Sequence, residues 1–406
     1  MKYLLMDVGS TNIKWCLCDT ETGGLSARKR IAFPQRLPEG GKYIFEVDAE
    51  AVWSCTEGIL EEATRRCPLE GILLSVQMHG YLLADDRFHF LTPYRSWRDR
   101  RALLKAGEES YYERFRREYP RSVPPESGSS CKPNLSVCSL YADSFLHPAL
   151  AERARHYFTL GSYLIFRMTG HNVTHLTDAA ASGFYLAQTG QVNEALAQLP
   201  PFRLLQFPAA CAGLPLAGFW KGVPVYPAVG DQQVAVLGCR LRPREILLNL
   251  GTAAQLCVRS EQFLKGKYES RPYFGGQWLC TFSGLCGGAQ IRRLADSTPQ
   301  DALAARLAAN YQEALERLPP GERLVITGGA ATHYAALIRK ACDLLPLPYL
   351  ILDGSDTLCG LQTLTEFVQK EEPSHDNGKR WEGPLRPYDQ RGTLPPFANH
   401  PSQRRL

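Results

Sequence analysis

Two carboxylates stand where an apolar stretch meets glycine. Asp7 lies near the end of the run YLLMDV at residues 3–8, two residues before Gly9, and Asp231 follows the run GVPVYPAV at residues 222–229 and then Gly230. A carboxylate at a strand end can orient Mg²⁺ beside phosphates or accept a hydroxyl proton. We predict that Asp7 orients the metal. We predict that Asp231 acts as the general base and accepts the hydroxyl proton while the metal supports the leaving phosphate. The alternatives are that Asp7 bonds its own turn and that Asp231 caps a helix.

Two turns of glycine and hydroxyl residues could hold phosphate groups. Gly9-Ser10-Thr11 follows the first apolar strand, and Gly251-Thr252 follows another at residues 246–250. Such turns offer backbone N–H groups and hydroxyls without side-chain bulk. Each alone also fits an ordinary hairpin, so the prediction rests on their repetition. The sequence contains neither G-x-x-x-x-G-K-[ST] nor G-x-G-x-x-G, which excludes the P-loop and Rossmann routes to phosphate.

Two further motifs combine the polar groups that a polyol site needs. Gln77-Met78-His79-Gly80 ends an apolar strand at residues 71–76, and Trp97-Arg98-Asp99-Arg100 follows a turn-rich segment. Together they supply an amide, an imidazole, a carboxylate, guanidinium groups and an indole face. The alternatives are that the histidine is a satisfied turn residue and that Asp99 forms a surface ion pair with Arg100 or Arg101.

A glycine pair in the second half of the chain could lie against a flat ring or a ribose. Gly328-Gly329-Ala330 follows the apolar strand at residues 323–327 and opens a helix. Without side chains the backbone can approach such a ligand closely. Many α/β turns have the same order of strand, glycines and helix, so this motif is only supporting evidence for a nucleotide site.

The order of apolar segments predicts a duplicated architecture. Residues 3–18 and 246–258 each read as strand, glycine turn and strand, which suggests a repeated βββαβα core with a cleft between its halves. The other expected elements are helices at 50–66, 99–118, 138–169, 301–318 and 331–344, strands at 71–76, 222–229 and 323–327, a loop at 121–136 and a tail at 372–406.

Composition narrows the classes of partner and compartment. The 406 residues carry 46 basic and 41 acidic side chains without a basic block, so we expect neither nucleic acid nor a membrane surface as a partner. No stretch approaches the roughly 18 apolar residues of a membrane helix. The 13 cysteines contain no C-x-x-C pair. A cytoplasmic protein with reduced thiols is the expectation, and a homodimer is left open.

In this order the motifs resemble the FGGY family of carbohydrate kinases, from residue 3 to about residue 368. Any one element is common, whereas the whole series is specific. The matching elements are Asp7-Val8-Gly9-Ser10-Thr11 with Lys14, Gln77-Met78-His79-Gly80, Trp97-Arg98-Asp99-Arg100, Thr177-Asp178 with Ala181-Ser182, Gly230-Asp231-Gln232-Gln233, Gly251-Thr252 and Gly328-Gly329-Ala330.

The resemblance implies a two-domain α/β protein of the actin/hexokinase-like (ribonuclease H-like) ATPase fold. Its domains would span residues 1–238 and 239–371, followed by the tail. It implies transfer of phosphate from ATP, with Mg²⁺, to a terminal hydroxyl of a ketose or polyol. By position in the motifs, the general base would be Asp231, the metal residues Asp7 and Asp231, the ATP contacts Gly9, Ser10, Thr11, Lys14, Gly251, Thr252, Gly288, Gly328, Gly329 and Ala330, and the sugar contacts Gln77, Met78, His79, Asp99, Asn134, Asp231 and Gln232.

Within the family, residues 248–256, Arg271-Pro272-Tyr273-Phe274 and Gly287-Gly288 are similar to sedoheptulokinases, whereas Gln77 to Gly80 is shared with xylulokinases. Sedoheptulose is therefore the first expected sugar and xylulose the second. A P-x-x-x-G-E-R-x-P stretch typical of the family is missing, and a single helix at 301–318 is expected to lead to Gly328. This shortened second domain leaves a catalytically weak sugar- or nucleotide-binding regulator as the alternative. An actin-like or chaperone-type ATPase ranks lower because it has no use for the sugar motifs.

Overall fold

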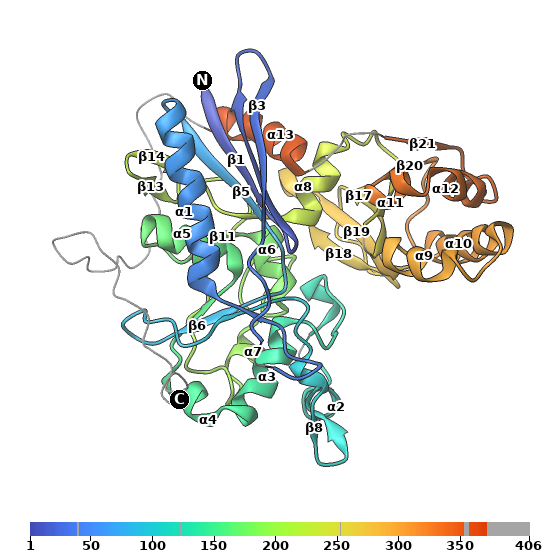
Figure 1. Ribbon diagram of the computed structural model, residues 1–406. Helices are drawn as coiled ribbons and strands as arrows, with labels where there is room; N and C mark the ends of the chain where they lie inside the picture. The colour runs from blue at the N-terminus through green and yellow to red at the C-terminus, as the bar shows by residue number, and fades with distance from the viewer. Residues whose placement is uncertain (39, 122, 252, 353–356, 372–406) are drawn as a thin grey trace. The chain divides into compact units, whose positions relative to one another are not determined.

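The computed structural model describes residues 1–371 apart from residues 39, 122, 252 and 353–356 (Figure 1). The predictions for Thr252 and for the tail at 372–406 lie outside the described residues. The chain divides into two compact units. Unit 1 holds Met1–Asp231 and the described residues from Leu361 onward, and unit 2 holds Gln232–Gly360. The domain boundaries expected at residues 238 and 371 stay predictions.

The sheet of unit 1 joins an antiparallel half to a parallel half. The first three strands are antiparallel, and β1 is parallel to β5 on its other side. The short β15 also pairs with β5. In sheet order the strands are β13 (Gly218–Trp220), β14 (Val223–Val225), β5 (Gly71–Val76), β1 (Lys2–Val8), β2 (Asn12–Asp19) and β3 (Gly24–Ala32), with β15 (Val229–Gly230) off this path.

The sheet of unit 2 repeats the same plan. β16 is antiparallel to β17, which is antiparallel to β19, whereas β20 and β21 continue in parallel on the other side of β16. The duplicated βββαβα core and the α/β class are therefore confirmed. In sheet order the strands are β18 (Glu269–Pro272), β19 (Trp278–Leu285), β17 (Ala254–Ser260), β16 (Glu245–Leu250), β20 (Arg323–Thr327) and β21 (Tyr349–Ile351).

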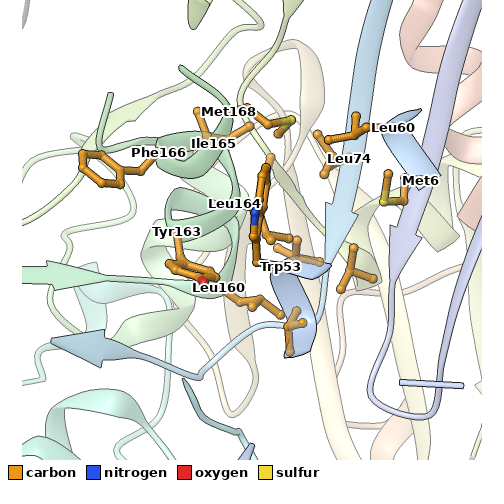
Figure 2. Close-up of a cluster of buried hydrophobic side chains, with 14 of the residues drawn as sticks. Met6, Trp53, Leu60, Leu74, Leu160, Tyr163, Leu164, Ile165, Phe166 and Met168 are labelled. Carbon is orange, nitrogen blue, oxygen red and sulfur yellow. The ribbon is translucent and has the colours of Figure 1, made fainter. Parts of the chain in front are cut away.

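Two helices cover one face of the sheet of unit 1. Helix α1 (Ala49–Arg66) begins where the sequence predicts, because the side chain of Asp48 accepts a hydrogen bond from the N–H of Glu50. Helix α5 (Leu160–Thr169) is capped by Thr159. Figure 2 shows their apolar side chains packed with those of β1 and β5. This core fixes the strands whose ends carry the predicted site.

Three predicted helices are interrupted in the structure. The stretch 99–118 is helical in α2 (Tyr111–Glu118) and in one 3₁₀ turn, because Gly107 adopts a φ of 80° in a tight hairpin and Ser110 then starts the helix with a capping box. Residues 138–169 contain α3 (Ser136–Leu146), α4 (Pro148–Arg153), a strand and α5. Residues 331–344 break at Tyr334 between α11 (Gly329–His333) and α12 (Ala335–Cys342).

Two further expectations are corrected. The strand expected at 222–229 is split into β14 and β15, with Pro227, which has no N–H for a ladder, lying between them. A single helix was expected after Gly288, but α9 (Gly288–Ala295) precedes α10 (Gln300–Leu315), with Pro299 just before the second helix. The apolar face of α10 packs into the core of unit 2. None of the described helices combines the length and apolar character that a membrane crossing requires.

The remaining elements are short, except for helix α13. A second apolar cluster of unit 1 lies around α2 and α3. The expected loop at 121–136 holds one 3₁₀ turn before α3 begins. The remaining strands and helices are β4 (Glu46–Val47), β6 (Leu82–Ala84), β7 (Tyr94–Arg95), β8 (Lys105–Ala106), β9 (Glu109–Ser110), β10 (His156–Phe158), β11 (Val173–His175), α6 (Leu176–Ala179), α7 (Glu194–Ala197), β12 (Ala209–Cys211), α8 (Asp231–Gly238) and α13 (Thr357–Glu371).

Candidate active site

The sheet of unit 1 brings the two predicted acidic residues to the same edge. Strand β5 lies between β1 and β15, and Ser75 pairs with Asp7 on one side and with Val229 on the other. All three strands run in parallel, so their carboxyl ends meet at one edge. Asp7 therefore lies at this edge, and Asp231 follows directly after Gly230 at the same level as Gln77.

Asp7 is held by a hydroxyl on one oxygen and an ammonium group on the other. Its side chain is only 5% exposed, and Ser75 Oγ donates a hydrogen bond to Asp7 Oδ1 at 2.8 Å. Lys14 Nζ lies 3.8 Å from Asp7 Oδ2. The Gly9 N–H in the adjoining turn donates to the Asn12 carbonyl at 3.1 Å. The structure thus places Asp7, Lys14 and the turn of Gly9, Ser10 and Thr11 together.

This carboxylate suits a magnesium ion that is shared with phosphate. The described residues contain no group of three or more His, Cys, Asp or Glu side chains that could hold a metal by themselves. Mg²⁺ usually keeps several waters and takes one or two carboxylates together with substrate phosphates. A single buried acid beside a turn that contains Gly9 fits that pattern.

The strand end at Gln77 leads into a constrained turn. The Gln77 N–H donates to the Val8 carbonyl at 3.1 Å, and Met78 is 6% exposed. His79 adopts a left-handed φ of 67°, which is uncommon for a residue with a side chain. Its Nδ1 lies 2.6 Å from the Ala181 carbonyl, and Ser136 Oγ donates to the His79 carbonyl at 2.9 Å.

These contacts join three motifs that are distant in sequence. Ala181 belongs to the segment that follows Thr177-Asp178, and Ser136 opens α3 two residues after Asn134. Asn134 is half-buried in the loop before that helix. These hydrogen bonds support the alternative that His79 is a satisfied turn residue, and a ligand role for His79 stays a prediction.

Tyr94 is a neighbour of the site that the motifs did not indicate. A Cβ at Gly80 would lie 2.3 Å from the Tyr94 hydroxyl oxygen, so only glycine fits there. Burial, and then the charges of Asp178 and Asp231, hold the pKa of Tyr94 well above its usual range. The one feature of the sequence that could have indicated Tyr94 is its position three residues before Trp97.

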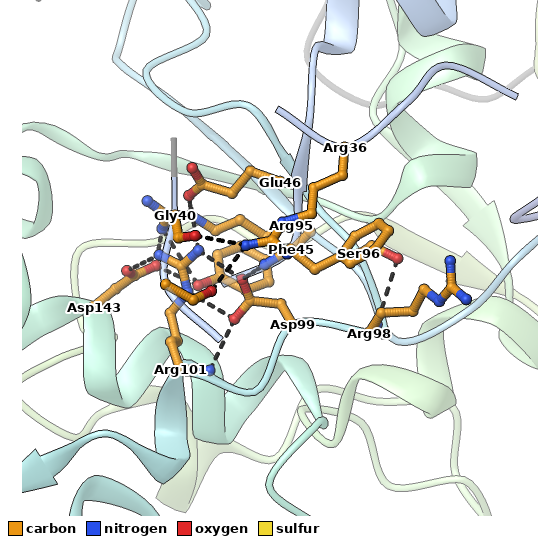
Figure 3. Close-up of polar contacts among 12 residues, drawn as sticks. Arg36, Gly40, Phe45, Glu46, Arg95, Ser96, Arg98, Asp99, Arg101 and Asp143 are labelled. Carbon is orange, nitrogen blue, oxygen red and sulfur yellow. Dashed lines mark hydrogen bonds and ion pairs between the residues drawn. The ribbon is translucent and has the colours of Figure 1, made fainter. Parts of the chain in front are cut away.

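Asp99 is fully engaged inside the protein, as Figure 3 shows. It is 1% exposed; its Oδ2 accepts from the Phe45 N–H at 2.8 Å and its Oδ1 from Arg101 Nε at 2.9 Å. Burial alone would raise its pKa, but the hydrogen bonds and charge of Arg101 lower it. Arg101 also contacts Glu46 and Asp143. The ion pair with Arg101 is therefore present and buried rather than on the surface, and a sugar contact by Asp99 stays a prediction.

The described ATP contacts that are predicted in unit 2 lie close to one another, near Gly251. The Gly288 N–H donates to the Gly251 carbonyl at 2.9 Å, and a Cβ at Gly288 would lie 3.2 Å from Ala330 Cβ. Gly328 has a φ of 102°, and a Cβ there would lie 2.6 Å from the Leu250 carbonyl oxygen. A Cβ at Gly329 would meet open space.

Gln232 is anchored within unit 2 by another residue that the resemblance singled out. It is 7% exposed, Arg271 Nη1 donates to its Oε1, and its Nε2 donates to Thr281 Oγ1 at 3.4 Å. Arg271 in turn forms an ion pair with Glu269. Sequence reasoning placed Gln232 in the sugar site but gave Arg271 no role.

A comparison with protein families identifies the family to which these residues belong. Residues 2–238 match the model of the FGGY family of carbohydrate kinases, N-terminal domain. The chain belongs to the FGGY family of carbohydrate kinases. An L-fuculokinase of Salmonella typhi is 27% identical over 277 residues, and a xylulose kinase of Streptomyces coelicolor is 28% identical over 281 residues.

The length of the match differs between sequence and structure. The matched segments cover 64% of this chain and 57% of the fuculokinase, and 63% of this chain and 54% of the xylulose kinase, so the chain spans about half the length of the curated relatives it matches. A ligand-bound xylulose kinase from Lactobacillus acidophilus is similar over 92% of this chain and 90% of that one, with a TM-score of 0.77 and 15% identity. At that identity the likeness supports the FGGY kinase fold alone.

Proposed function

We propose that the chain is an ATP-dependent kinase that phosphorylates a terminal hydroxyl of a ketose or polyol. The observation that carries the proposal is the placement of Asp7 and Asp231 at one sheet edge, on either side of β5. The two carboxylates can therefore serve different ends of one reaction. Membership of the FGGY family supports it.

In this proposal Asp231 accepts the proton of the attacking sugar hydroxyl. A carboxylate in that role makes the sugar oxygen a better nucleophile as it bonds to the γ-phosphorus of ATP and ADP leaves. Asp7 and Asp231 would hold the Mg²⁺ of bound MgATP, and Lys14 and the turn of Gly9, Ser10 and Thr11 would contact its phosphates. Bound MgATP supplies the phosphoryl group, and the ion offsets the charge of the phosphates.

The nucleotide and sugar contacts complete the proposal. The glycine-lined turn in unit 2 suits a nucleotide because its backbone lacks side-chain bulk. The proposed ATP contacts there are Gly251, Thr252, Gly288, Gly328, Gly329 and Ala330. The proposed sugar contacts are Gln77, Met78, His79, Asp99, Asn134, Asp231 and Gln232.

Sedoheptulose is the first proposed substrate and xylulose the second. The support is the similarity of residues 248–256 and of Arg271 to Phe274 to sedoheptulokinases. The relatives named fuculokinase and xylulose kinase act, by those names, on ketoses. L-Fuculose therefore joins the panel to be tested.

The test is ADP release by the full chain with MgATP and a panel of sedoheptulose, xylulose, L-fuculose, glycerol and gluconate. We expect one ketose to raise ADP release at least about 100-fold above the sugar-free rate. Sugar binding seen by calorimetry without sugar-dependent ADP release would instead favour the regulator. ADP release that no sugar changes, with no sugar shifting the melting temperature, would contradict the kinase proposal.

A further inference from the structure

The turn that presents Asp231 is supported from two sides. Strand β15 has only two residues, Val229 and Gly230, which pair with Ser75 and Val76 of β5. So short a strand cannot fix the direction of the next side chain by its own ladder. The segment from Thr174 to Thr177 supplies the second support.

Three hydrogen bonds join that segment to the turn. The His175 N–H and the Thr174 hydroxyl both donate to the Ala228 carbonyl, at 3.0 and 3.1 Å. The Gly230 N–H donates to Thr177 Oγ1 at 2.9 Å. Thr177 therefore holds the peptide group between Val229 and Gly230, one residue before Asp231.

The position of the Thr177 hydroxyl is itself fixed by His175. His175 Nδ1 accepts from the Thr177 N–H at 3.2 Å and caps helix α6, so the ring proton resides on Nε2. Nε2 donates to the Ala212 carbonyl at 2.8 Å. The Thr177 hydroxyl, 2.9 Å from Nδ1, shares the single Nδ1 lone pair with the Thr177 N–H, so its oxygen lone pairs stay directed to Gly230. Burial lowers the pKa of His175 to about 4, which keeps the ring neutral.

We propose that Thr177, oriented by His175, is a positioning residue that aims Asp231 at the sugar hydroxyl. This inference rests on the proposed function of Asp231 as general base. His175 and Thr177 are each 1% exposed, and the proposal gives neither a direct contact with a substrate. Their effect is on the alignment of the base, where an error of about 1 Å can cost on the order of 100-fold in rate.

The deciding variant is Thr177→Val, which removes the hydroxyl and keeps the shape. We expect kcat to fall about 10- to 100-fold while KM for ATP and for the sugar stays within about threefold. Amide hydrogen exchange in peptides containing residues 228–231 should become at least about tenfold faster. Thr177→Ser should restore both kcat and protection, because it keeps the acceptor oxygen.

The matched control is Thr56→Val. Thr56 is also fully buried, and its hydroxyl donates to the Val52 carbonyl inside α1 at 2.9 Å. This change removes one buried hydroxyl without touching the turn, so kcat and exchange at 228–231 should match the wild type. Equal effects of the two valine variants would overturn the proposal.

A second variant covers the case in which Thr177→Val does not fold. His175→Phe keeps a ring but removes both nitrogens, so the Thr177 hydroxyl is no longer oriented. We expect a smaller fall in kcat, about 3- to 10-fold, with faster exchange at 228–231. Unchanged kcat and exchange in this variant would exclude His175 from the positioning role.

The two proposals fail in different ways. If the wild-type chain shows no sugar-dependent ADP release, the kinase function fails, and the catalytic part of the positioning proposal fails with it. Exchange at 228–231 then still tells whether Thr177 holds the turn. If the wild type is active and Thr177→Val retains its kcat, the positioning proposal alone is wrong.

Discussion

Ser75 Oγ donates a hydrogen bond to Asp7 Oδ1 at 2.8 Å, across the parallel strands β5 and β1. The same residue pairs on its other side with Val229, two residues before Asp231. One position of the central strand thus relates the two proposed catalytic acids. Because the two acids lie on opposite sides of β5, changes at Asp7 should affect the metal end of the reaction and leave the sugar end intact.

Asp7→Ala should raise the magnesium concentration required for half-maximal rate and lower kcat by roughly 10²-fold or more, because the ion must offset phosphate charge. Sugar affinity measured by calorimetry should stay within about threefold. The comparison variant is Ser75→Ala, which keeps the carboxylate and should have a weaker effect in the same direction. Loss of sugar binding with intact MgATP binding would reverse the assignment of the two ends.

Gly80→Ala should destabilise unit 1 by about 1–3 kcal/mol, because its Cβ would lie 2.3 Å from the Tyr94 hydroxyl oxygen. Chemical denaturation measures the loss. Tyr94→Ala removes the whole ring, whose Cε2 and Cζ would also lie 2.4 and 2.5 Å from that Cβ, so Gly80→Ala should cost less in the Tyr94→Ala background than in the wild type. Strictly additive effects of the two changes would show that this contact does not limit residue 80.

Replacement of Asp178 by an uncharged residue should increase the stability of the protein in a pH-dependent way. Burial raises its pKa to about 6, against the hydrogen bonds from Thr159 and Thr174. A raised carboxyl pKa contributes stability below the unfolded pKa of about 4, and that contribution is lost as the pH rises through about 6. Asp178→Asn should therefore stabilise the protein at pH 7.5 by about 2–3 kcal/mol and give little gain at pH 4. An equal gain at both pH values would exclude ionisation of Asp178 as the cause.

His79→Ala should flatten the preference among sugars more than it changes KM for ATP. A buried polar site discriminates because a substrate that lacks one hydroxyl leaves a partner unpaired, at a cost of about 1–3 kcal/mol. The measurement is kcat/KM for each sugar of the panel in both proteins. A uniform fall for all sugars would assign His79 to the turn geometry that its φ of 67° requires rather than to recognition.

The sequence predicts the features that leave a local pattern. The alternating strands, the start of helix α1 and the glycines after β1 and β16 all lie where the residues predict them. The prediction of one helix over residues 99–118 is wrong. The many Arg and Glu residues favour a helix throughout, but the turn at Gly107 interrupts it and the helix starts only at the cap residue Ser110.

The contacts that surround the site leave no such pattern. Tyr94 meets Gly80, and Thr177 meets Gly230, across long stretches of chain. From the sequence, Asp99 and Arg101 look like a surface ion pair. The structure buries the pair and places Glu46 and Asp143 in contact with Arg101. Residue types and spacing therefore predict which side chains could react, whereas their supports require the tertiary structure.

The most direct test of the proposed function is single-turnover and steady-state kinetics of Asp231→Asn. The amide is nearly isosteric with the carboxylate but cannot accept the proton, so kcat with the preferred ketose should fall by roughly two to four orders of magnitude. Binding of MgATP and sugar, measured by calorimetry on the same preparation, should stay within about threefold of the wild type. A kcat close to that of the wild type would contradict the general-base role of Asp231.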